Sequence, residues 1–417
     1  MNLSHLVAAA GAVVALALAP AAPAAAQAKT IKFALCYDLS KVYAGLAPQV
    51  SQAARDYAKL VNQSGGIEGH SVEIAVQDHG NEPQRAIECY ENMKRQGAIA
   101  FDFYSTPVAR AVLPRIMKDG NVMIQSVVGR GDAADGEVFK WVFQIAPTYW
   151  TQSANIMEYV KQQAKGSLKG TKIAFVYVDT PFGQEPIEVL KAIAAREGFE
   201  LQLYPFSLPG TDQSAAWSQV RRFNPDWVIS WTVSSMHAVA AREMKRNGIP
   251  MTKFITGGWI SESDLNNIGH DNAKGMKRVS YVVSGQELPI HGRILKELYE
   301  KDAGSGDRKN LDINYNTGLA IYSNFFEGAR LALKQYGSPL TPDKFRRGLE
   351  SIRNYDANGL MAPNTVTATD HEGSGQTRIE MWDGAKWVPQ TPWYAAYRDV
   401  VRSVVKRESA KFAATAN

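Results

Sequence analysis

The sequence contains little cysteine, no long apolar stretch after its first residues and no concentrated run of basic residues. Its 417 residues include two cysteines, which cannot build a disulfide framework or, on their own, a structural zinc site. After residue 19 no apolar run approaches the roughly 18 residues of a membrane-spanning helix, which excludes a polytopic membrane protein. The 46 basic and 41 acidic side chains leave a net charge of +5. Because Lys and Arg are dispersed, no nucleic-acid partner is expected.

Catalytic signatures are also missing. The chain has no G-x-S-x-G elbow, H-E-x-x-H, P-loop or C-x-x-C motif. Residues 129–134 match G-x-G-x-x-A, but they follow the fourth expected strand and lead into a loop, which disfavours dinucleotide binding. The histidines after residue 28 share no metal-ligand spacing. We therefore predict a protein that is not an enzyme and that needs neither a cofactor nor a metal ion.

The N-terminal segment indicates export. Residues 6–19 are an uninterrupted run of apolar and small residues closed by Pro20, too short to cross a bilayer but typical of a signal-peptide core. Ala26 and Ala28 supply the small residues that a signal peptidase recognises, although no Lys or Arg precedes the run. A buried alanine-rich helix is the alternative, disfavoured because Pro and Gly interrupt the segment. We predict a signal peptide at residues 1–28 and a soluble protein in the periplasm.

Export would place the two cysteines in a compartment that permits disulfides. Cys36 lies in the first expected strand and Cys89 in the second expected helix. In a right-handed doubly wound sheet the second crossover helix packs over the first strand, so the two thiols could meet. Two buried free thiols that behave as small apolar side chains are the alternative. The sequence leaves both possibilities open.

Apolar runs alternate with helical patterns along the chain. Strands are expected at residues 31–37, 72–76, 99–103, 122–128, 171–176, 199–206, 226–232, 252–257 and 278–283, with a late pair near 377–388. Helices are expected at residues 46–62, 83–95, 107–118, 184–197, 212–223, 235–247, 314–333, 342–353 and 391–417. Alternation of this kind predicts parallel βαβ units. T-K-I-A-F-V at Thr171 echoes T-I-K-F-A-L at Thr30, which predicts two similar α/β lobes in tandem.

The loops that follow the strands are where open α/β sheets bind ligands. Ser105, Thr106 and Pro107 follow the third expected strand and are typical of a helix start. Free N–H groups and the helix dipole there favour an anion such as a carboxylate, and ordinary helix capping is the alternative. Aromatic residues gather in loops of the same kind, namely Tyr43, Tyr104, Tyr149, Trp150, Phe182, Trp231 and Trp259. Together these positions predict an aromatic-lined cleft between the lobes.

Several stretches match a known family. They are V-N-Q-S-G-G-I-E-G at residues 61–69, Asp78, N-E-P at 81–83, Ala86, D-T-P-F-G at 179–183, G-T-D at 210–212 and G-H-D-N-A-K-G-M at 269–276. The chain resembles the periplasmic solute-binding receptors of the leucine/isoleucine/valine (branched-chain amino acid) type, which serve ATP-binding-cassette (ABC) importers. The resemblance extends to about residue 390.

The resemblance implies an α/β fold of two Rossmann-like, doubly wound lobes joined by a three-crossover hinge, the type I periplasmic-binding fold. It implies an N-terminal lobe of residues 29–147 plus 285–355, a C-terminal lobe of 148–284 plus 356–390, and a helical tail at 391–417. Members of the family close on a ligand between the lobes by hinge bending. The implied partners are a small-molecule carboxylate and the membrane subunits of an ABC permease, and the receptor is expected to be a monomer.

Family positions carried over to this chain predict where the ligand lies. The loop of Ser105 and Thr106 should hold the ligand carboxylate, and residues 126–129 should line the first lobe. Phe182 and the loops at 231–234 and 257–259 should line the second lobe. The predicted ligand-binding residues are Tyr43, Tyr104, Ser105, Thr106, Ser126, Val127, Val128, Tyr149, Trp150, Phe182, Trp231, Ser234 and Trp259.

Two departures from the family bear on the ligand. Amino-acid receptors have a threonine at the position nearest to Gly129 and a glutamate in the loop that here is residues 257–259, and both hold the ligand ammonium. Glu262 could replace that glutamate only if the loop shifts. Because burying an unpaired ammonium costs several kcal/mol, we predict a small carboxylate, an aromatic acid, as the ligand. A branched-chain or other amino acid is the alternative ligand, and ligand sensing for a membrane signalling system is the alternative role.

Overall fold

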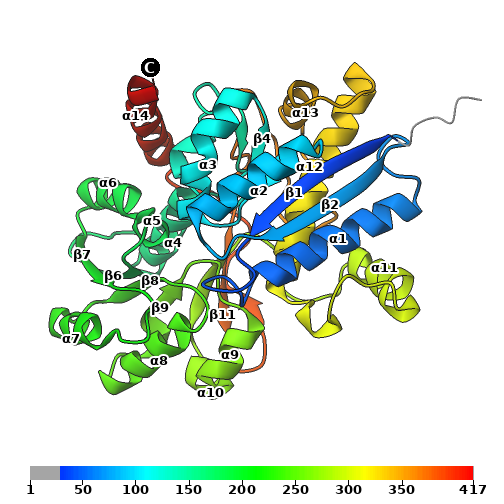
Figure 1. Ribbon diagram of the computed structural model, residues 1–417. Helices are drawn as coiled ribbons and strands as arrows, with labels where there is room; N and C mark the ends of the chain where they lie inside the picture. Colours follow the sequence, from blue (N-terminus) through cyan, green and yellow to red (C-terminus); the bar gives the residue numbers. More distant parts are fainter. Residues whose placement is uncertain (1–28, 417) are drawn as a thin grey trace, which may run out of the picture.

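The computed structural model describes residues 29–416 as two α/β lobes (Figure 1). The predicted signal peptide, residues 1–28, lies outside the described residues. The first lobe is built on a parallel sheet with the strand order β2-β1-β3-β4-β5. Its strands are β1 (Thr30–Tyr37), β2 (Ser71–Asp78), β3 (Ala100–Asp102), β4 (Val122–Ile124) and β5 (Val142–Phe143).

The second lobe is built on a larger sheet with the order β12-β11-β10-β9-β8-β6-β7. Its strands are β6 (Lys172–Val178), β7 (Glu200–Phe206), β8 (Trp227–Trp231), β9 (Phe254–Thr256), β10 (Lys277–Ser280), β11 (Arg378–Trp382) and β12 (Trp387–Pro389). Strands β6 to β10 pair in parallel, whereas β11 pairs antiparallel with both β10 and β12. The late strand pair expected from the sequence therefore extends the sheet of the second lobe.

Helices surround both sheets (Figure 1). In the first lobe they are α1 (Ala47–Gln63), α2 (Pro83–Arg95), α3 (Thr106–Asp119), α11 (Pro289–Glu297), α12 (Ile313–Tyr336) and α13 (Pro342–Leu349), with short turns η1 (Gly131–Ala134), η3 (Tyr299–Lys301) and η4 (Arg308–Asn310). In the second lobe they are α4 (Tyr149–Gln163), α5 (Pro181–Gln184), α6 (Ile187–Glu197), α7 (Ser214–Phe223), α8 (Met236–Arg246), η2 (Met251–Lys253), α9 (Glu262–Ile268) and α10 (His270–Ala273).

Strand β1 explains why helices cover both faces of the first sheet. Successive side chains of a strand point to opposite faces. Phe33 and Leu35 pack in the core cluster that contains α1 and α12, whereas Ala34 and Cys36 pack in a second cluster with α2 and α3. Cys36 and Cys89 form a disulfide there, with their Cα atoms 6.1 Å apart. Of the two possibilities that the sequence left open, the structure contains the cross-link between β1 and α2.

The chain passes between the lobes three times. It leaves the first sheet after β5 and enters α4, returns after β10 to α11, and crosses again between α13 and β11. This is the three-crossover arrangement of two doubly wound lobes that the resemblance implied. The loops after β1, β3 and β4 consequently face those after β6, β8 and β9 across the gap between the lobes.

Some elements differ from the sequence prediction. Helix α4 was not predicted, because its buried residues include the polar Gln152, Ser153 and Asn155, which obscure the apolar spacing. The helix expected at 184–197 is divided at Pro186 into α5 and α6. The strand expected at 122–128 ends at Ile124, so the rest of that segment is free to form a loop at the sheet edge.

The C-terminal helix α14 (Arg398–Ala416) contacts both lobes. Lys406 Nζ lies 2.9 Å from Asp135 Oδ1, in the first lobe directly after η1. One residue further on, Arg407 Nη2 lies 3.4 Å from Glu188 Oε2 of α6, in the second lobe. Helix α14 therefore bridges the lobes outside their three connecting segments.

Candidate ligand-binding site

A narrow cavity lies between the lobes, where the loops after the strands of both sheets meet. It is nearly closed, with a volume of about 10 Å³, and is lined by Tyr43, Leu46, Tyr104, Ser105, Thr106 and Val128 of the first lobe and by Tyr149, Phe182, Val233 and Trp259 of the second. None of these lining residues bears a formal charge. An apolar, aromatic cavity with a few hydroxyl groups is the usual composition of a small-molecule site.

Most of the predicted ligand-binding residues line this cavity. They are Tyr43, Tyr104, Ser105, Thr106, Val128, Tyr149, Phe182 and Trp259. Two lining residues, Leu46 and Val233, were not predicted. Val233 belongs to the loop at 231–234 that was expected to line the second lobe. Its position in that loop could therefore have identified it as a lining residue. Leu46 directly precedes α1, and an aliphatic residue there cannot be distinguished from ordinary core by sequence.

Other predicted residues do not line the cavity, and their contact with ligand stays a prediction. Trp231 lies behind Tyr149, with the two rings edge to face and their centroids 5.5 Å apart. Trp150 packs instead on Gly131, where a Cβ atom would lie only 2.3 Å from the indole. The predicted residues Ser126, Val127 and Ser234 are also absent from the lining. Of the three predicted tryptophans, Trp259 therefore lines the cavity, Trp231 packs behind its wall and Trp150 contacts the first lobe.

The N-terminus of α3 meets the cavity without a side-chain cap. Ser105 occupies the N-cap position, but its hydroxyl donates to Asn81 Oδ1 at 2.6 Å. Thr106 Oγ1 accepts the Gly129 N–H at 3.1 Å, which fixes the loop after β4 beside the helix. The first N–H groups of a helix have no intrahelical partner. Those of α3 are consequently available to an anion next to Ser105 and Thr106.

A buried network beneath this helix start shapes the loop. Asp102 accepts hydrogen bonds from the hydroxyls of Tyr37 at 2.6 Å and Tyr322 at 2.9 Å, and from the Tyr104 N–H at 3.1 Å. Burial raises the pKa of Asp102 to about 7. Tyr104 has φ 45°, a left-handed conformation that is uncommon for residues other than glycine. The bond from its N–H to Asp102 helps to hold the turn that brings Ser105 and Thr106 to the cavity.

Aromatic side chains from both lobes meet in the cavity wall. The Trp259 ring lies edge to face against Tyr104, with centroids 5.5 Å apart. Trp259 Nε1 also donates to the Tyr149 hydroxyl at 2.9 Å, and Tyr149 packs edge to face on Phe182 at 5.3 Å. Within the described residues, the buried hydroxyl of Tyr104 has no hydrogen-bond partner. A buried hydroxyl of this kind is a ready partner for a polar group of a ligand.

Glu262 does not occupy the place of the missing glutamate. Its Oε2 accepts the N–H of Ile313 at 3.3 Å, at the first residue of α12. The carboxylate thereby serves the start of a first-lobe helix and is not part of the cavity lining. Burial and, to a lesser extent, the nearby Glu262 raise the pKa of neighbouring Asp312 to about 7.

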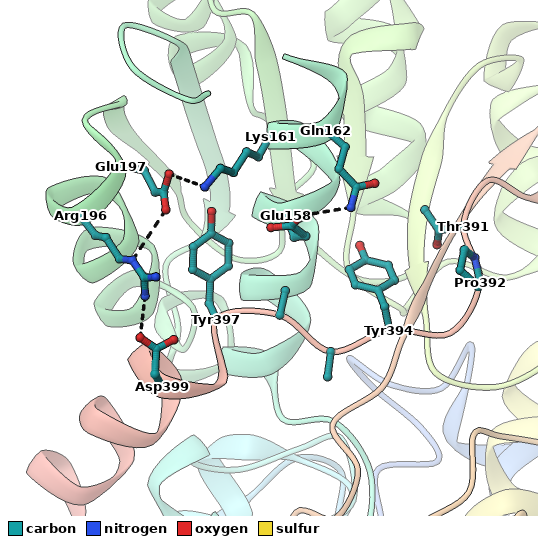
Figure 2. Close-up of a pocket in the computed structure, with 12 residues that line it drawn as sticks. Glu158, Lys161, Gln162, Arg196, Glu197, Thr391, Pro392, Tyr394, Tyr397 and Asp399 are labelled. Carbon is teal, nitrogen blue, oxygen red and sulfur yellow. Dashed lines mark hydrogen bonds and ion pairs between the residues drawn. The ribbon is translucent and has the colours of Figure 1, made fainter. Parts of the chain in front are cut away.

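A second and wider cavity lies on the second lobe, between α4, α6 and the segment that precedes α14 (Figure 2). Four of its five charged side chains form ion pairs with one another. Lys161 Nζ lies 2.8 Å from Glu197 Oε2, and Arg196 Nη1 lies 2.6 Å from Asp399 Oδ2. Because these charges already satisfy each other and the cavity is open to solvent, the narrower cavity between the lobes is the stronger candidate for a ligand site.

Comparison with known proteins agrees with this architecture. Residues 30–386 match the sequence family described as periplasmic binding protein, whereas no curated protein matches the chain. A structure from the Pseudomonas fluorescens group, described as an ABC transporter permease, is 32% identical, with 93% of this chain and 97% of that chain covered and a TM-score of 0.85. Within residues 29–416, no helix is both long enough and apolar enough to cross a membrane.

Two more distant structures share the fold. A fatty acid ABC transporter substrate-binding protein from Thermomonospora curvata is 24% identical, covering 90% of this chain and 94% of its own, with a TM-score of 0.75. A branched-chain amino acid ABC transporter protein from Thermus thermophilus, with bound valine, is 19% identical, covering 90% and 98%, with a TM-score of 0.78. The chain belongs to the periplasmic binding protein family. It is a solute-binding receptor of the ABC-transporter type and not an enzyme.

Proposed function

We propose that this receptor binds a small carboxylate, an aromatic acid, between its lobes and delivers it to the membrane subunits of an ABC importer. The observation that supports the ligand class is the composition of the cavity. Five aromatic rings and three aliphatic side chains line it, with hydroxyls at Ser105 and Thr106 and no carboxylate. The uncapped start of α3 offers N–H groups to the ligand anion, and the aromatic wall fits a flat apolar body.

The same composition argues against an α-amino acid. An amino acid would bring an ammonium group into a cavity whose lining contains no negative charge. Glu262, the nearest candidate partner in the sequence, is occupied at the start of α12. A buried cation without a partner costs several kcal/mol, which corresponds to a loss of several decades in affinity.

Two alternatives follow from the comparisons and the fold. The structure from Thermus thermophilus contains valine, so an amino acid remains the second candidate ligand, whereas the Thermomonospora curvata protein is described as a fatty acid receptor. A receptor of this fold that controls a membrane sensor is the second candidate role. Copurification with permease subunits would support import and exclude sensing as the main role.

Isothermal calorimetry tests the ligand class. Phenylacetate, benzoate and hydroxycinnamate should bind, phenylacetamide should bind much less tightly because it lacks the anion, and leucine and phenylalanine should not bind measurably. Tight binding of leucine that Glu262→Gln abolishes and Trp259→Ala leaves unchanged would overturn the proposal in favour of an amino acid. Mass spectrometry of ligand retained after purification gives an independent answer.

The proposal also includes the location and assembly state. We propose export through residues 1–28, a soluble receptor in the periplasm and a monomer that closes on its ligand. The first lobe is assigned to residues 29–147 plus 285–355 and the second to 148–284 plus 356–390. X-ray scattering should show a smaller radius of gyration with ligand than without it. Tight binding with an unchanged radius would contradict closure of two lobes.

A further inference from the structure

We infer that Glu185 is a positioning residue that latches the two lobes together around the ligand cavity. It follows α5 in the second lobe, and its side chain is 2% exposed. One carboxylate oxygen accepts from Arg110 Nη2 and the other from the Gly131 N–H at 3.0 Å, and both donors belong to the first lobe. The inference rests on the proposed binding of a ligand between the lobes.

Each element that the latch joins also lines the cavity. Arg110 lies one helical turn after Thr106 on α3, and Gly131 closely follows Val128 in the loop after β4. On the other side, Glu185 directly follows α5, the short helix that presents Phe182 to the cavity. The two hydrogen bonds therefore fix the spacing between the anchoring side of the cavity and part of its aromatic wall.

Close packing makes this contact sensitive to small movements. A Cβ atom at Gly131 would lie 2.3 Å from the indole of Trp150 in the second lobe. A Cβ atom at Gly183, within α5, would lie 1.8 Å from the carbonyl oxygen of Val178, so α5 rests directly on the end of β6. Because Gly131 has no room to slide past Trp150 of the other lobe, hinge opening should separate Glu185 from its donors.

The charges around the latch are unequally buried. The Arg110 side chain is 42% exposed, whereas Glu185 is almost fully buried. Asp132 faces the carboxylate with a like charge, and Arg130, Glu188 and Glu408 line the open depression outside it. Burial raises the pKa of Glu185 to about 7, against the opposing effects of Arg110 and the Gly131 N–H. Arg110 left alone would be solvated at little cost, whereas Glu185 left alone would be a buried, unpaired charge.

A distance measurement that needs no ligand tests the latch. Spin labels on Lys118→Cys of α3 and Arg222→Cys of α7, both exposed, report the separation of the lobes at pH 8, with the Cys36–Cys89 disulfide retained. Glu185→Ala should lower the ratio of closed to open molecules about tenfold. Charge-assisted hydrogen bonds are lost in this variant, and their contribution is smaller than for a fully buried pair because Arg110 is partly exposed to solvent. Arg110→Ala should also open the protein, but should add nothing in the Glu185→Ala background.

Binding kinetics give a second readout, with phenylacetate as the probe. Loss of the latch should raise the dissociation rate about tenfold and leave the association rate and the stoichiometry unchanged, whereas misfolding would lower the stoichiometry. Arg293→Ala with Glu297→Ala is the matched control and should change nothing, because this pair within α11 lies far from the latch in the sequence and joins an exposed Arg293 to a half-buried Glu297 of the same helix.

Identical distance distributions for the unaltered protein and Glu185→Ala, or additive effects of the Arg110 and Glu185 variants, would overturn the latch. Failure of phenylacetate to bind the unaltered protein would count against the proposed ligand class, and the ligand-free distances would still decide the latch.

Discussion

Two helix starts face the cleft from opposite lobes, and they use similar residues in different ways. In the second lobe, Thr180 precedes Pro181 and its side chain accepts the Gly183 N–H at 3.4 Å, as a conventional N-cap. In the first lobe, Ser105 and Thr106 precede Pro107, but neither side chain caps α3. Their hydroxyls contact Asn81 and Gly129 instead. A hydroxyl residue before proline thus identifies a helix start but does not reveal whether its N–H groups are free.

The difference assigns separate tasks to the two sides of the cavity. The first lobe offers hydrogen-bond donors at α3, where a carboxylate is stabilised by N–H groups and the helix dipole. The second lobe contributes Tyr149, Phe182, Val233 and Trp259, which are apolar or aromatic. We therefore expect the ligand to contact the first lobe through its anion and the second through its apolar body.

The largest effect on affinity is expected at the uncapped helix start. Ser105→Ala combined with Thr106→Ala should weaken binding of a carboxylate ligand about tenfold to a hundredfold. The Thr106 hydroxyl accepts from Gly129 and so keeps its own proton to donate to the anion, and a charge-assisted hydrogen bond of this kind contributes about 1.5–3 kcal/mol. Calorimetry with phenylacetate gives the loss. Phenylacetamide is the control ligand, since an uncharged amide should lose little. Unchanged affinity for phenylacetate would place the anion site elsewhere.

Removal of the apolar wall should have the next largest effect. Trp259 is 5% exposed, and it contacts Tyr104 across the cleft and Tyr149 within its own lobe. Trp259→Ala should cost about 2 kcal/mol of binding energy, roughly thirtyfold, as for other buried aromatic anchors. Trp227→Ala, a half-buried tryptophan of the same lobe outside the lining, should leave affinity unchanged. Equal losses in the two variants would indicate general destabilisation of the second lobe.

A smaller effect is expected from pH, through Glu185. The buried carboxyl in the closed form has a pKa of about 7, whereas an exposed one after opening should titrate near about 4.3. Because the closed form binds the proton more tightly, protonation adds to closure. This added contribution is fully present below the lower value and is lost as pH rises through about 7, above which the hydrogen bonds from Arg110 and Gly131 to the ionised carboxylate remain. Affinity for phenylacetate should fall between pH 6 and 8, and Glu185→Gln should remove that dependence. A dependence that persists in Glu185→Gln would assign the titration to another group, such as Asp102.

The smallest effects should come from the capped helix start and from Glu262. Thr180→Ala should lower the free energy of unfolding by about 0.5 kcal/mol, the low end for loss of an N-cap, and urea unfolding measures it.

Glu262→Gln should change ligand affinity by no more than about twofold, the range of substitutions away from the site. A tenfold loss of ligand affinity in either variant would contradict the separate tasks of the two lobes.

Sequence patterns predicted the parts of the fold that depend on short-range regularity. Buried strands such as β1 and β6 and amphipathic helices such as α1 and α2 follow directly from the period of their apolar residues. Helix α4 was missed because Gln152 and Asn155 are buried and polar, and they bond to the Pro147 carbonyl and to Thr377. A hydrogen-bond partner as far along the chain as Thr377 leaves no periodic pattern in the sequence from which the helix could be predicted.

The sequence predicted which loops form the candidate site, but not which of their residues line the cavity and which lie behind its wall. Loop position alone placed Tyr149 and Trp231 equally near the cleft, yet the edge-to-face contact puts Trp231 behind Tyr149. The latch was not predicted at all. Arg110 and Glu185 are ordinary charged helix residues in the sequence, and only the closed arrangement of the lobes brings them together.

Helix α14 has a consequence for the use of this receptor as a biosensor. A fluorescent protein fused behind α14 would not be a passive reporter, because the helix is held by Asp135 in one lobe and by Glu188 in the other. The fused protein could disturb the contacts of α14 with both lobes, and the fluorescence measured at a given solute concentration would then change. The exposed turn at residues 165–167, between α4 and β6, belongs to one lobe alone. Insertion of a reporter there should preserve the response of the receptor to its solute.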